Sequence, residues 1–406
     1  MSEFIPALIF LVLIAALVRD DTVLTLCYFM AAVYVTSRWW SRRAFNSIKF
    51  TRVFTDRAFP NETVSVRLEV NNRSLLPVVW LSLYEGAVPE ISGGQSFREV
   101  ISLGPRGRKR FEYTLHPYKR GYYPVGPLFL HSGDLFGLSD DALSQGASDH
   151  LTVYPRIVPL ARLGLPSRSP LGTLRHTQPI FEDPARVIGK RDYVNGDSLR
   201  RVDWKATAAS GRLQVKQLEP SIALEALIAL DLRDDSYDRR ARYDDSELAI
   251  VVAASVANHI INQKQPVGLL TNARDATDSL PHPRSSDGGG QGWGFIPARN
   301  GRSHLMRLLE ILARAQTSNS APALTDLLAN QIAGLPWGAT LILITSQADD
   351  SLLDSLFHAR RAGLNAVVIL VGHGQGFSAF RSRAGRFGFT VYEVARERDM
   401  VSPSTL

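Results

Sequence analysis

The hydrophobic periodicity of this 406-residue chain changes near Ser221, and the change limits the folds that the chain can adopt. From Ser47 to about Ile157, apolar residues recur at nearly every second position, as they do in half-buried β-strands. After Ser221, apolar segments of strand length alternate with segments in which apolar residues have helical spacing. We therefore predict an all-β unit followed by an α/β unit.

The all-β unit is predicted to be an immunoglobulin-like β-sandwich. Loop segments rich in Gly, Pro, Asn and Ser separate its apolar stretches at short intervals, and no helical pattern intervenes. Regular short strands with such loops, over about 100 residues, are typical of this fold. The predicted strands are Thr63–Val70, Val78–Tyr84, Phe97–Leu103, Arg110–Leu115 and Leu128–His131.

The second unit is predicted to be a doubly wound α/β domain with a mostly parallel sheet. Its predicted strands are Ala223–Leu232, Val267–Leu270, Ala339–Thr345, Ala366–Val371 and Phe389–Val394. Its predicted helices are Ser246–Gln263, Ser303–Ala315, Thr325–Ile332 and Ser351–Ala362. The Gly-rich segment Asp275–Asn300 lacks the lysine of a phosphate-binding loop, so we interpret it as a flexible hairpin loop.

Two uncharged stretches, Phe4–Val18 and Thr22–Ser37, precede the sandwich, and charged residues separate and follow them. Each is near the short end of the length that crosses a bilayer. Trp39 and Trp40 occupy the position of an interfacial aromatic belt, and the arginines around them favour a cytoplasmic location by the positive-inside rule. The pattern predicts a transmembrane helical hairpin over residues 1–43.

This hairpin would make the chain a multi-pass protein of the cytoplasmic (inner) membrane, in contact with membrane lipid, with its soluble domains in the cytoplasm. A cleaved signal peptide fits less well because Met1–Phe4 contains no Lys or Arg. A buried two-helix core is the other alternative, and the all-apolar character of both stretches argues against it.

The composition leaves several partner classes open. A formal net charge of +7 favours acidic partners such as anionic lipid, an acidic protein face or nucleic acid, although a solvated basic surface explains it equally well. Nucleic acid is not expected, because the basic residues form no stripe with interleaved aromatic residues. The single cysteine, Cys27, excludes an intramolecular disulfide.

A dense polar run, RDYVNGDSLRRVDWKATAASGRLQVKQLEPS, extends from Arg191 to Ser221 after a linker-like segment rich in Pro, Gly, Ser and Thr. It fits no common catalytic or phosphate-binding motif. We call the following residues the signature: Arg191, Tyr193, Gly196, Asp197, Arg200, Arg201, Asp203, Trp204 and Lys205.

The signature resembles the hallmark of the domain-of-unknown-function 58 family, roughly R-x-Y-x-x-G-D-x-x-R-x-I-D-W-K-x-x-A. Arg120–Tyr122, Gly126–Pro127 and Ser132–Leu138 are similar to the family's RGxYxxGPxxxxSxDPFGL run, with Leu135 in place of the usual Pro. The resemblance covers essentially the entire chain. It implies a von Willebrand factor type A-like domain and a partner role with a MoxR-type AAA+ ATPase.

These patterns divide the chain into four parts. Residues 1–43 are the predicted transmembrane hairpin, and residues 44–160 the β-sandwich. Residues 161–221 are the linker with the signature, and residues 222–406 the type A-like α/β domain.

The resemblance also identifies a degenerate ion position. Type A domains of this kind often bind Mg²⁺ through D-x-S-x-S, a Thr and a later Asp, all oxygen ligands. The corresponding residues here are Asp231, Arg233, Asp235, Thr325 and Gln347. Because Arg233 replaces the first Ser and can displace the ion by pairing with Asp231 or Asp235, we predict no metal and no other cofactor.

The carboxyl ends of the strands remain the default binding edge of such a sheet. The candidates there are Asp231, Arg233, Asp234, Asp235 and Thr325. The alternative is that Asp234 and Asp235 only begin a solvated loop.

The signature allows three interpretations. As structure, Asp197 would cap the turn Ser198–Val202, Trp204 would fill a domain seam, and Arg201 or Lys205 would pair with Asp203 or Glu219. As a binding surface, its cations and Trp204 would anchor a partner. As an enzyme site, Asp197 and Asp203 would be acid and base, without a nucleophile or histidine.

The sequence therefore predicts a membrane-anchored, cytoplasmic-facing, non-enzymatic adaptor or assembly factor that works with a MoxR-type AAA+ ATPase. The alternative is an enzyme at the membrane face in envelope metabolism, using the carboxylates near Asp231 and Asp197. The oligomeric state stays open.

Overall fold

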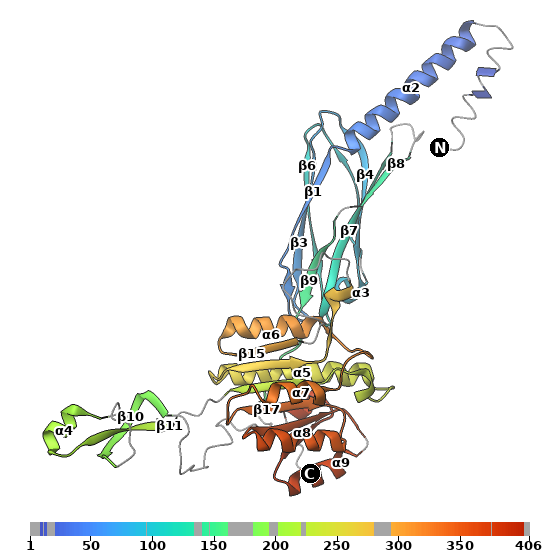
Figure 1. Cartoon of the computed structure of the whole chain (residues 1–406). Helices are drawn as coiled ribbons and strands as arrows, with labels where there is room; N and C mark the ends of the chain where they lie inside the picture. The colour runs from blue at the N-terminus through green and yellow to red at the C-terminus, as the bar shows by residue number, and fades with distance from the viewer. Residues whose placement is uncertain are drawn as a thin grey trace. The chain divides into compact units, whose positions relative to one another are not determined.

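The computed structural model describes residues 9–10, 12–13, 21–94, 96–133, 140–145, 147–160, 182–194, 202–220, 225–279, 294–374 and 376–401 (Figure 1). The chain divides into two compact units. The first comprises Met1–Arg156 and Leu309–Ala315, and the second comprises Ile157–Leu308 and Gln316–Leu406.

The elements of the N-terminal part are α2 (Asp21–Phe45), β1 (Ile48–Val53), β2 (Arg57–Ala58), β3 (Val64–Asn72), β4 (Val78–Ala87), α3 (Pro89–Ser92), β5 (Arg98–Leu103), β6 (Arg108–Leu115), β7 (Gly121–Gly133), β8 (Asp140–Gln145) and β9 (Asp149–Val153). The strands form two sheets, one in the order β1-β3-β6 and one in the order β2-β9-β7-β4-β5 with β8 beside β7. Alternate residues of β3 are buried, which is the period that the sequence shows for this strand.

The two sheets enclose an apolar core. Leu68 of β3 packs in one cluster with Leu81 of β4 and Leu128 of β7, and all three are fully buried. Ala44 and Phe45, at the end of α2, belong to the same cluster. The last turn of α2 is therefore part of the sandwich core.

Most of the first predicted span, Phe4–Val18, lies outside the described residues, and the described part shows no transmembrane hairpin. Among the residues that the structure describes, no helix is both long and apolar enough to cross a membrane. Helix α2 begins at Asp21, inside the charged segment predicted to be the turn, and continues past Arg38 to Phe45. Trp40, predicted to lie in a lipid interface, donates its Nε1–H to the Pro77 carbonyl at 3.1 Å. The predicted hairpin and the multi-pass membrane location built on it are therefore wrong.

A buried ion pair crosses the sandwich. The guanidinium of Arg52 on β1 pairs with Glu85 on β4, and each side chain is 1% exposed. Arg52 also pairs with Asp149 on β9, whose side chain is 51% exposed. Gly126 lies against this arginine with a φ of 103°, and a Cβ there would meet Arg52 Nη2 at 2.9 Å. The glycine of the Gly126–Pro127 motif thus makes room for the ion pair.

Strands β10 (Glu182–Asp192) and β11 (Gln214–Pro220) pair antiparallel in a two-stranded sheet, and α4 (Trp204–Ser210) lies between them in sequence. We call β10, α4 and β11 the arm (Figure 1). Val202 and Val215 bridge to each other and are buried. The arm was predicted as linker and signature without regular structure, because neither strand has the alternation of a half-buried strand.

The α/β part contains β12 (Ala226–Leu230), η2 (Asp234–Ser236), α5 (Arg242–Asn262), β13 (Val267–Thr271), β14 (Arg274–Asp275), η3 (Ala276–Ser279), β15 (Gly294–Arg299), α6 (Arg302–Arg314), β16 (Ala315–Gln316), α7 (Leu324–Ile332), β17 (Thr340–Thr345), α8 (Asp350–Arg361), β18 (Asn365–Val371), α9 (Phe377–Arg386), β19 (Thr390–Val394) and α10 (Glu397–Val401). Its six-stranded sheet has the order β15-β13-β12-β17-β18-β19. All neighbours pair in parallel except β13 and β15.

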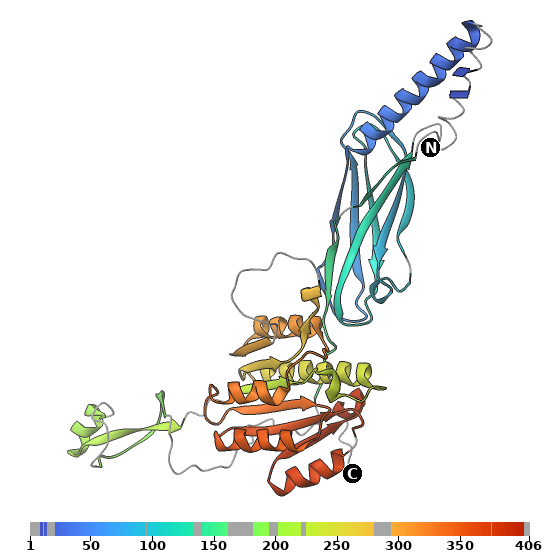
Figure 2. The same ribbon diagram turned by 45° about the vertical axis from the view of Figure 1, so that its right-hand side comes forward.

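Helices cover both faces of this sheet (Figure 2). On one face, Leu328 of α7, Leu356 of α8 and Phe380 of α9 pack on Leu343 of β17 in one buried cluster. On the other face of the sheet lies α5, in which every residue from Leu248 to Val256 is buried. Covering both faces explains why β12 and β13 are buried at every position rather than at alternate ones.

Two predicted segments differ from the structure. Gly294–Arg299, predicted to be part of a flexible loop, is strand β15 at the edge of the sheet, while residues 280–293 of that loop lie outside the described residues. Helix α9 was not predicted, because Ser, Arg and Gly occupy most of its exposed positions and leave only Phe377, Phe380 and Ala384 buried.

Candidate functional site

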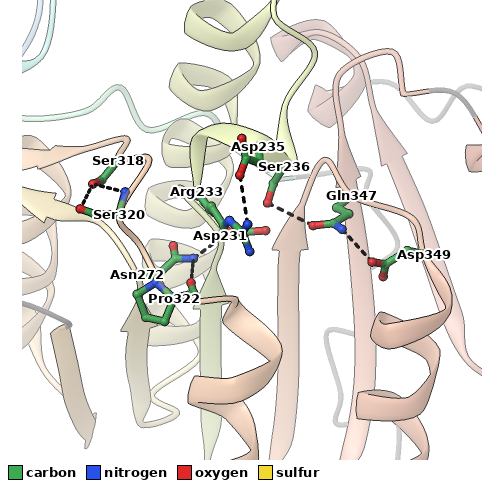
Figure 3. A network of polar contacts seen from close by, with 10 residues as sticks. All are labelled: Asp231, Arg233, Asp235, Ser236, Asn272, Ser318, Ser320, Pro322, Gln347 and Asp349. Atoms are coloured by element: carbon green, nitrogen blue, oxygen red, sulfur yellow. Dashed lines mark hydrogen bonds and ion pairs between the residues drawn. The ribbon is translucent and has the colours of Figure 1, made fainter.

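Asp231 is the centre of a polar network at the carboxyl end of β12 (Figure 3). Its residue surface is 4% exposed. Oδ1 accepts hydrogen bonds from Asn272 Nδ2 at 2.9 Å and from the backbone N–H of Arg233 at 3.2 Å. Oδ2 accepts from Thr345 Oγ1 at 3.0 Å. Both oxygens of this buried carboxylate are therefore held by uncharged donors.

Asn272 and Thr345 were not predicted as site residues. Asn272 follows the last residue of β13, and Thr345 is the last residue of β17. Since β13 and β17 flank β12 in parallel, both side chains reach Asp231 from the same edge of the sheet. Asn272 Oδ1 also accepts from the Leu232 N–H at 2.6 Å, and its Nδ2 donates to the Pro322 carbonyl at 3.0 Å. The sequence does contain a signal for both residues, because each is a polar residue at the carboxyl end of a buried strand.

Arg233 pairs with Asp235 and not with the Asp231 carboxylate. Its Nη2 lies 3.0 Å from Asp235 Oδ2, and the two side chains are 35% and 66% exposed. The Nε–H of Arg233 is buried and has no hydrogen-bond partner among the described residues. Of the two ion-pair partners predicted for Arg233, the structure shows Asp235. The Nε–H donor of the guanidinium stays without an acceptor among the described residues.

A second chain of contacts closes the other side of the site (Figure 3). Ser236 Oγ donates to Gln347 Oε1 at 3.2 Å, and Gln347 Nε2 donates to Asp349 Oδ2 at 2.7 Å. Asp349 is the N-cap of α8 and accepts from the Leu352 N–H at 3.0 Å. The negative charge of Asp349 therefore faces the positive end of a helix.

These groups surround a cavity of about 160 Å³. Asp231, Arg233, Thr325 and Gln347 line it, whereas Asp235, the partner of Arg233, is not among its lining residues. Thr325 is in the first turn of α7, whose N-cap Ala323 makes no side-chain cap hydrogen bond. Of the five predicted strand-end candidates, Asp231, Arg233 and Thr325 are thus brought together in one pocket. Asp234, predicted with them, pairs instead with Arg242 at 3.1 Å.

The residues present do not fit the Mg²⁺ ion that the resemblance implies. Asp231 accepts three hydrogen bonds from neutral donors, and the Arg233 cation lies where an oxygen ligand is needed. Among the described residues, no group of three or more His, Cys, Asp and Glu is arranged to hold a metal ion. We therefore assign no step to a metal at this site.

Two ionisable groups next to the network have pKa values that burial raises. Tyr237 donates its hydroxyl to the Asp231 carbonyl, and burial raises its pKa well above the ordinary value. Asp245, in the first turn of α5, is 7% exposed, and burial raises its pKa as well. A Cβ at Gly372 would meet Asp245 Oδ2 at 2.3 Å, so this carboxyl lies directly against the backbone.

The arm presents part of the signature in an ordered setting. Asp203 is the N-cap of α4 and accepts from the Ala206 N–H at 3.1 Å. Lys190 pairs with Asp203 at 3.0 Å, and this hydrogen bond is the main cause of the lowered pKa of Asp203. The side chain of Trp204 is 69% exposed, so it does not fill a seam as the structural interpretation predicted.

The other signature residues divide into two groups. Arg191 and Lys205 are exposed, and Tyr193 is half-buried and hydrogen-bonds through its N–H to the Leu213 carbonyl at 2.8 Å. Gly196, Asp197, Arg200 and Arg201 lie outside the described residues, together with the predicted Asp197 cap. Within the described part, Asp203 pairs with Lys190, whereas Arg201 or Lys205 had been predicted.

Comparison with known proteins finds a family match over part of the chain. Residues 189–331 match the model of the family described as protein of unknown function DUF58, which supports the resemblance over this part of the chain. An uncharacterised protein of Bacillus subtilis, YeaD, is 21% identical over 312 residues, or 76% of this chain and 70% of that protein.

Solved structures overlap this chain only in part. The CARDB domain of a Pyrococcus furiosus protein is 15% identical and covers 26% of this chain and 86% of its own, with a TM-score of 0.21. The complex of zinc 2-glycoprotein with prolactin-inducible protein from human seminal plasma is 13% identical, covering 26% and 92%, with a TM-score of 0.22. Scores this low carry no argument about function.

Proposed function

We propose that this chain is a non-enzymatic adaptor that binds partner proteins, and that the arm is one of its binding surfaces. The observation that carries the proposal is the exposure of Trp204, at 69% of its residue surface, on an element that is otherwise held in place. Exposed tryptophans beside cations are enriched among the residues that dominate binding energy at protein interfaces. Neither α4 nor its flanking strands need this ring for packing.

The arm holds Trp204 in a fixed position before a partner arrives. The preceding residue, Asp203, caps α4 and pairs with Lys190 of β10. Thr207 Oγ1 accepts from the Gln214 N–H at 3.0 Å and ties α4 to β11. Because these contacts order the helix in advance, less conformational entropy is lost when a partner binds the ring.

The charge of the arm supports an acidic protein face as the partner surface. In the part of the arm whose side-chain exposure the structure describes, residues 189–194 and 202–216, the exposed cations are Lys190, Arg191, Lys205, Arg212 and Lys216, against the carboxylates Asp192 and Asp203. Complementary charge at such a surface accelerates association and excludes partners of the same sign. An acidic face with a pocket for an indole ring fits this surface.

The identity of the partner and the subfamily of the α/β domain rest on the family resemblance. We propose a von Willebrand factor type A-like domain on the basis of its sheet order and of Asp231 at the end of β12. A MoxR-type AAA+ ATPase is the proposed partner. The enzyme alternative needs Asp231 as an acid or base, yet neutral donors already engage both of its oxygens.

The proposal is tested by the affinity of the purified chain for a MoxR-type ATPase of the same organism. We expect Trp204→Ala to weaken binding about 30-fold, the size of a strong interface residue, and Lys205→Glu to weaken it further. Because Trp204 is exposed, the thermal unfolding midpoint should not change.

The matched control is Trp39→Ala with Lys49→Glu, since Trp39 is 60% exposed and Lys49 is also exposed, both outside the arm. This control should bind the ATPase as the unchanged chain does. Equal affinities for the arm variant and the control would contradict the proposal.

A further inference from the structure

The strand-end cavity contains an unsatisfied cationic donor that the proposed function does not use. Arg233 Nε is buried without a hydrogen-bond partner, although the same guanidinium pairs with Asp235 through Nη2. Guanidinium groups bind carboxylates through two parallel N–H···O bonds, and here only one of the two is made within the chain. The arginine therefore has capacity for an oxyanion at the cavity (Figure 3).

The size of the cavity limits what the oxyanion can belong to. A cavity needs about 10–15 Å³ of water-accessible space to hold one water molecule, so about 160 Å³ holds on the order of ten waters. Sites for nucleotides, cofactors and drug-sized ligands are larger, on the order of 300–1,000 Å³. The volume matches one short acidic side chain and does not match a cofactor.

The local charge selects a carboxylate over a phosphate. Asp231 and Asp349 line the cavity, and both are negative. A carboxylate that takes the place of Asp235 on Arg233 adds a single negative charge, and the displaced Asp235 is hydrated at the surface. A phosphate group, with a charge of about −1.5 to −2, would add repulsion against these two carboxylates.

The exposure of Asp235 makes this exchange feasible. Its side chain is 66% exposed, so it can leave Arg233 and be hydrated at little cost. Asp231 cannot exchange in this way, because it is buried and three donors hold it. The start of α7 at the cavity, with no side-chain cap at Ala323, adds a partial positive charge on the same side.

We propose that the strand-end cavity binds the carboxylate of an acidic side chain of a partner protein through Arg233, without a metal ion. Asp235 occupies the arginine in the free protein and is displaced by the incoming carboxylate. Asp235 therefore acts as an internal competitor that lowers the affinity of the site. None of the residues of this site belongs to the arm. The proposal for the site is therefore tested independently of the role of Trp204.

The test uses propionate, which has the atoms of a glutamate side chain, and propionamide, its neutral counterpart. Both are titrated into the full chain while NMR follows the Nε–Hε resonance of Arg233, which is assigned by its absence in Arg233→Gln. Propionate should shift this resonance downfield as the Nε–H gains an acceptor, in EDTA as well as in Mg²⁺. Propionamide should not.

Two variants separate the roles of the pair. Asp235→Asn should bind propionate about tenfold more tightly, because the internal competitor is removed. Arg233→Lys keeps the charge but removes the Nε donor and the planar fork, so binding should be lost. Arg240→Gln, at an exposed arginine of the same loop, should bind as the unchanged chain does. Unchanged thermal unfolding midpoints show that each variant is folded.

The outcomes are distinct. Propionate binding that depends on Arg233 and is enhanced by Asp235→Asn supports the proposal. No shift in Asp235→Asn up to about 100 mM propionate overturns it, as does binding that requires Mg²⁺ or survives Arg233→Gln. Tighter binding of inorganic phosphate than of propionate also overturns it, because the charge argument would then be wrong. None of these results depends on ATPase binding by the arm.

Discussion

At the scale of single residues, Asp231 and Arg233 illustrate how far sequence reasoning reaches. The loss of an oxygen ligand at Arg233 is visible in the sequence, and it predicts that a guanidinium replaces the ion. The donors that hold Asp231 instead, Asn272 and Thr345, were not predicted, because they come from strands that are distant in sequence. Their proximity depends on the strand order, which no local pattern encodes.

Trp204 and Asp203 show the opposite case. One of the three interpretations of the signature, the structural one, predicted a cap at Asp197, which lies outside the described residues, and a buried Trp204; the structure contains a cap at Asp203. The burial of Trp204 was wrong, since 69% of its surface is exposed. A tryptophan in a polar run has no neighbouring apolar period to indicate which side faces solvent.

A residue-scale prediction concerns Asp245, whose pKa is raised by burial. Because the folded-state pKa lies above the unfolded value, its contribution to stability is fully present below the unfolded pKa of about 4 and is lost as the pH rises through the folded pKa. Asp245→Asn should therefore stabilise the α/β unit at about pH 7 and have little effect at about pH 3. Urea unfolding at both pH values measures this difference.

An electrostatic interaction with His373 lowers the Asp245 pKa and so opposes part of the effect of burial. Asp354→Asn, at an exposed carboxyl of α8 that does not contribute to the Asp245 pKa, is the control and should lack this pH dependence. Equal stabilisation by both variants at both pH values would show that burial of Asp245 is not the cause.

At the scale of elements, strands and helices with strong apolar periods were predicted and those without were missed. Strands β3 and β17 and helices α7 and α8 begin within a residue or two of their predicted limits. Strand β15 was missed because its partner β13 and a bulge between Val267 and Leu269 determine its pairing, not its own sequence. The transmembrane prediction for Thr22–Ser37 was wrong for a related reason. Hydropathy does not reveal that the helix containing this stretch, α2, ends in the sandwich core.

An element-scale prediction tests the β13–β15 edge at Gly268. A Cβ there would meet the Ile296 carbonyl oxygen at 2.7 Å and the Ala298 nitrogen at 3.0 Å. Both are backbone atoms and cannot rotate away, so Gly268→Ala should push β15 from the sheet and destabilise the α/β unit by about 1–3 kcal/mol. Hydrogen exchange of the β15 amides should increase with it.

The control for this change is Gly294→Ala in the same strand pair. A Cβ at Gly294 would meet only Thr271 Cγ2, at 3.6 Å, which is an ordinary contact. Its effect on unfolding should be a few tenths of a kcal/mol at most. If Gly294→Ala cost as much as Gly268→Ala, backbone crowding would not explain the edge.

At the scale of the whole molecule, each unit has a core of its own. The sandwich core combines α2 with strands of both sheets, and the α/β core combines α7, α8 and α9 with the parallel strands. The main boundary between the units lies at Arg156 and Ile157 and not at the change of periodicity near Ser221, and the arm belongs to the second unit. Separate cores lead us to expect separate unfolding transitions.

The Arg52–Glu85 pair makes that expectation testable, because it lies in the sandwich and both side chains are 1% exposed. Arg52→Met leaves Glu85 charged and buried, which should cost about 3–5 kcal/mol. Arg52→Met with Glu85→Leu removes both charges and should recover most of that loss, leaving Asp149 hydrated. In guanidinium unfolding, Arg52→Met should move one transition, and Gly268→Ala should move only the other. A single transition shifted by both variants would mean that the two cores unfold together.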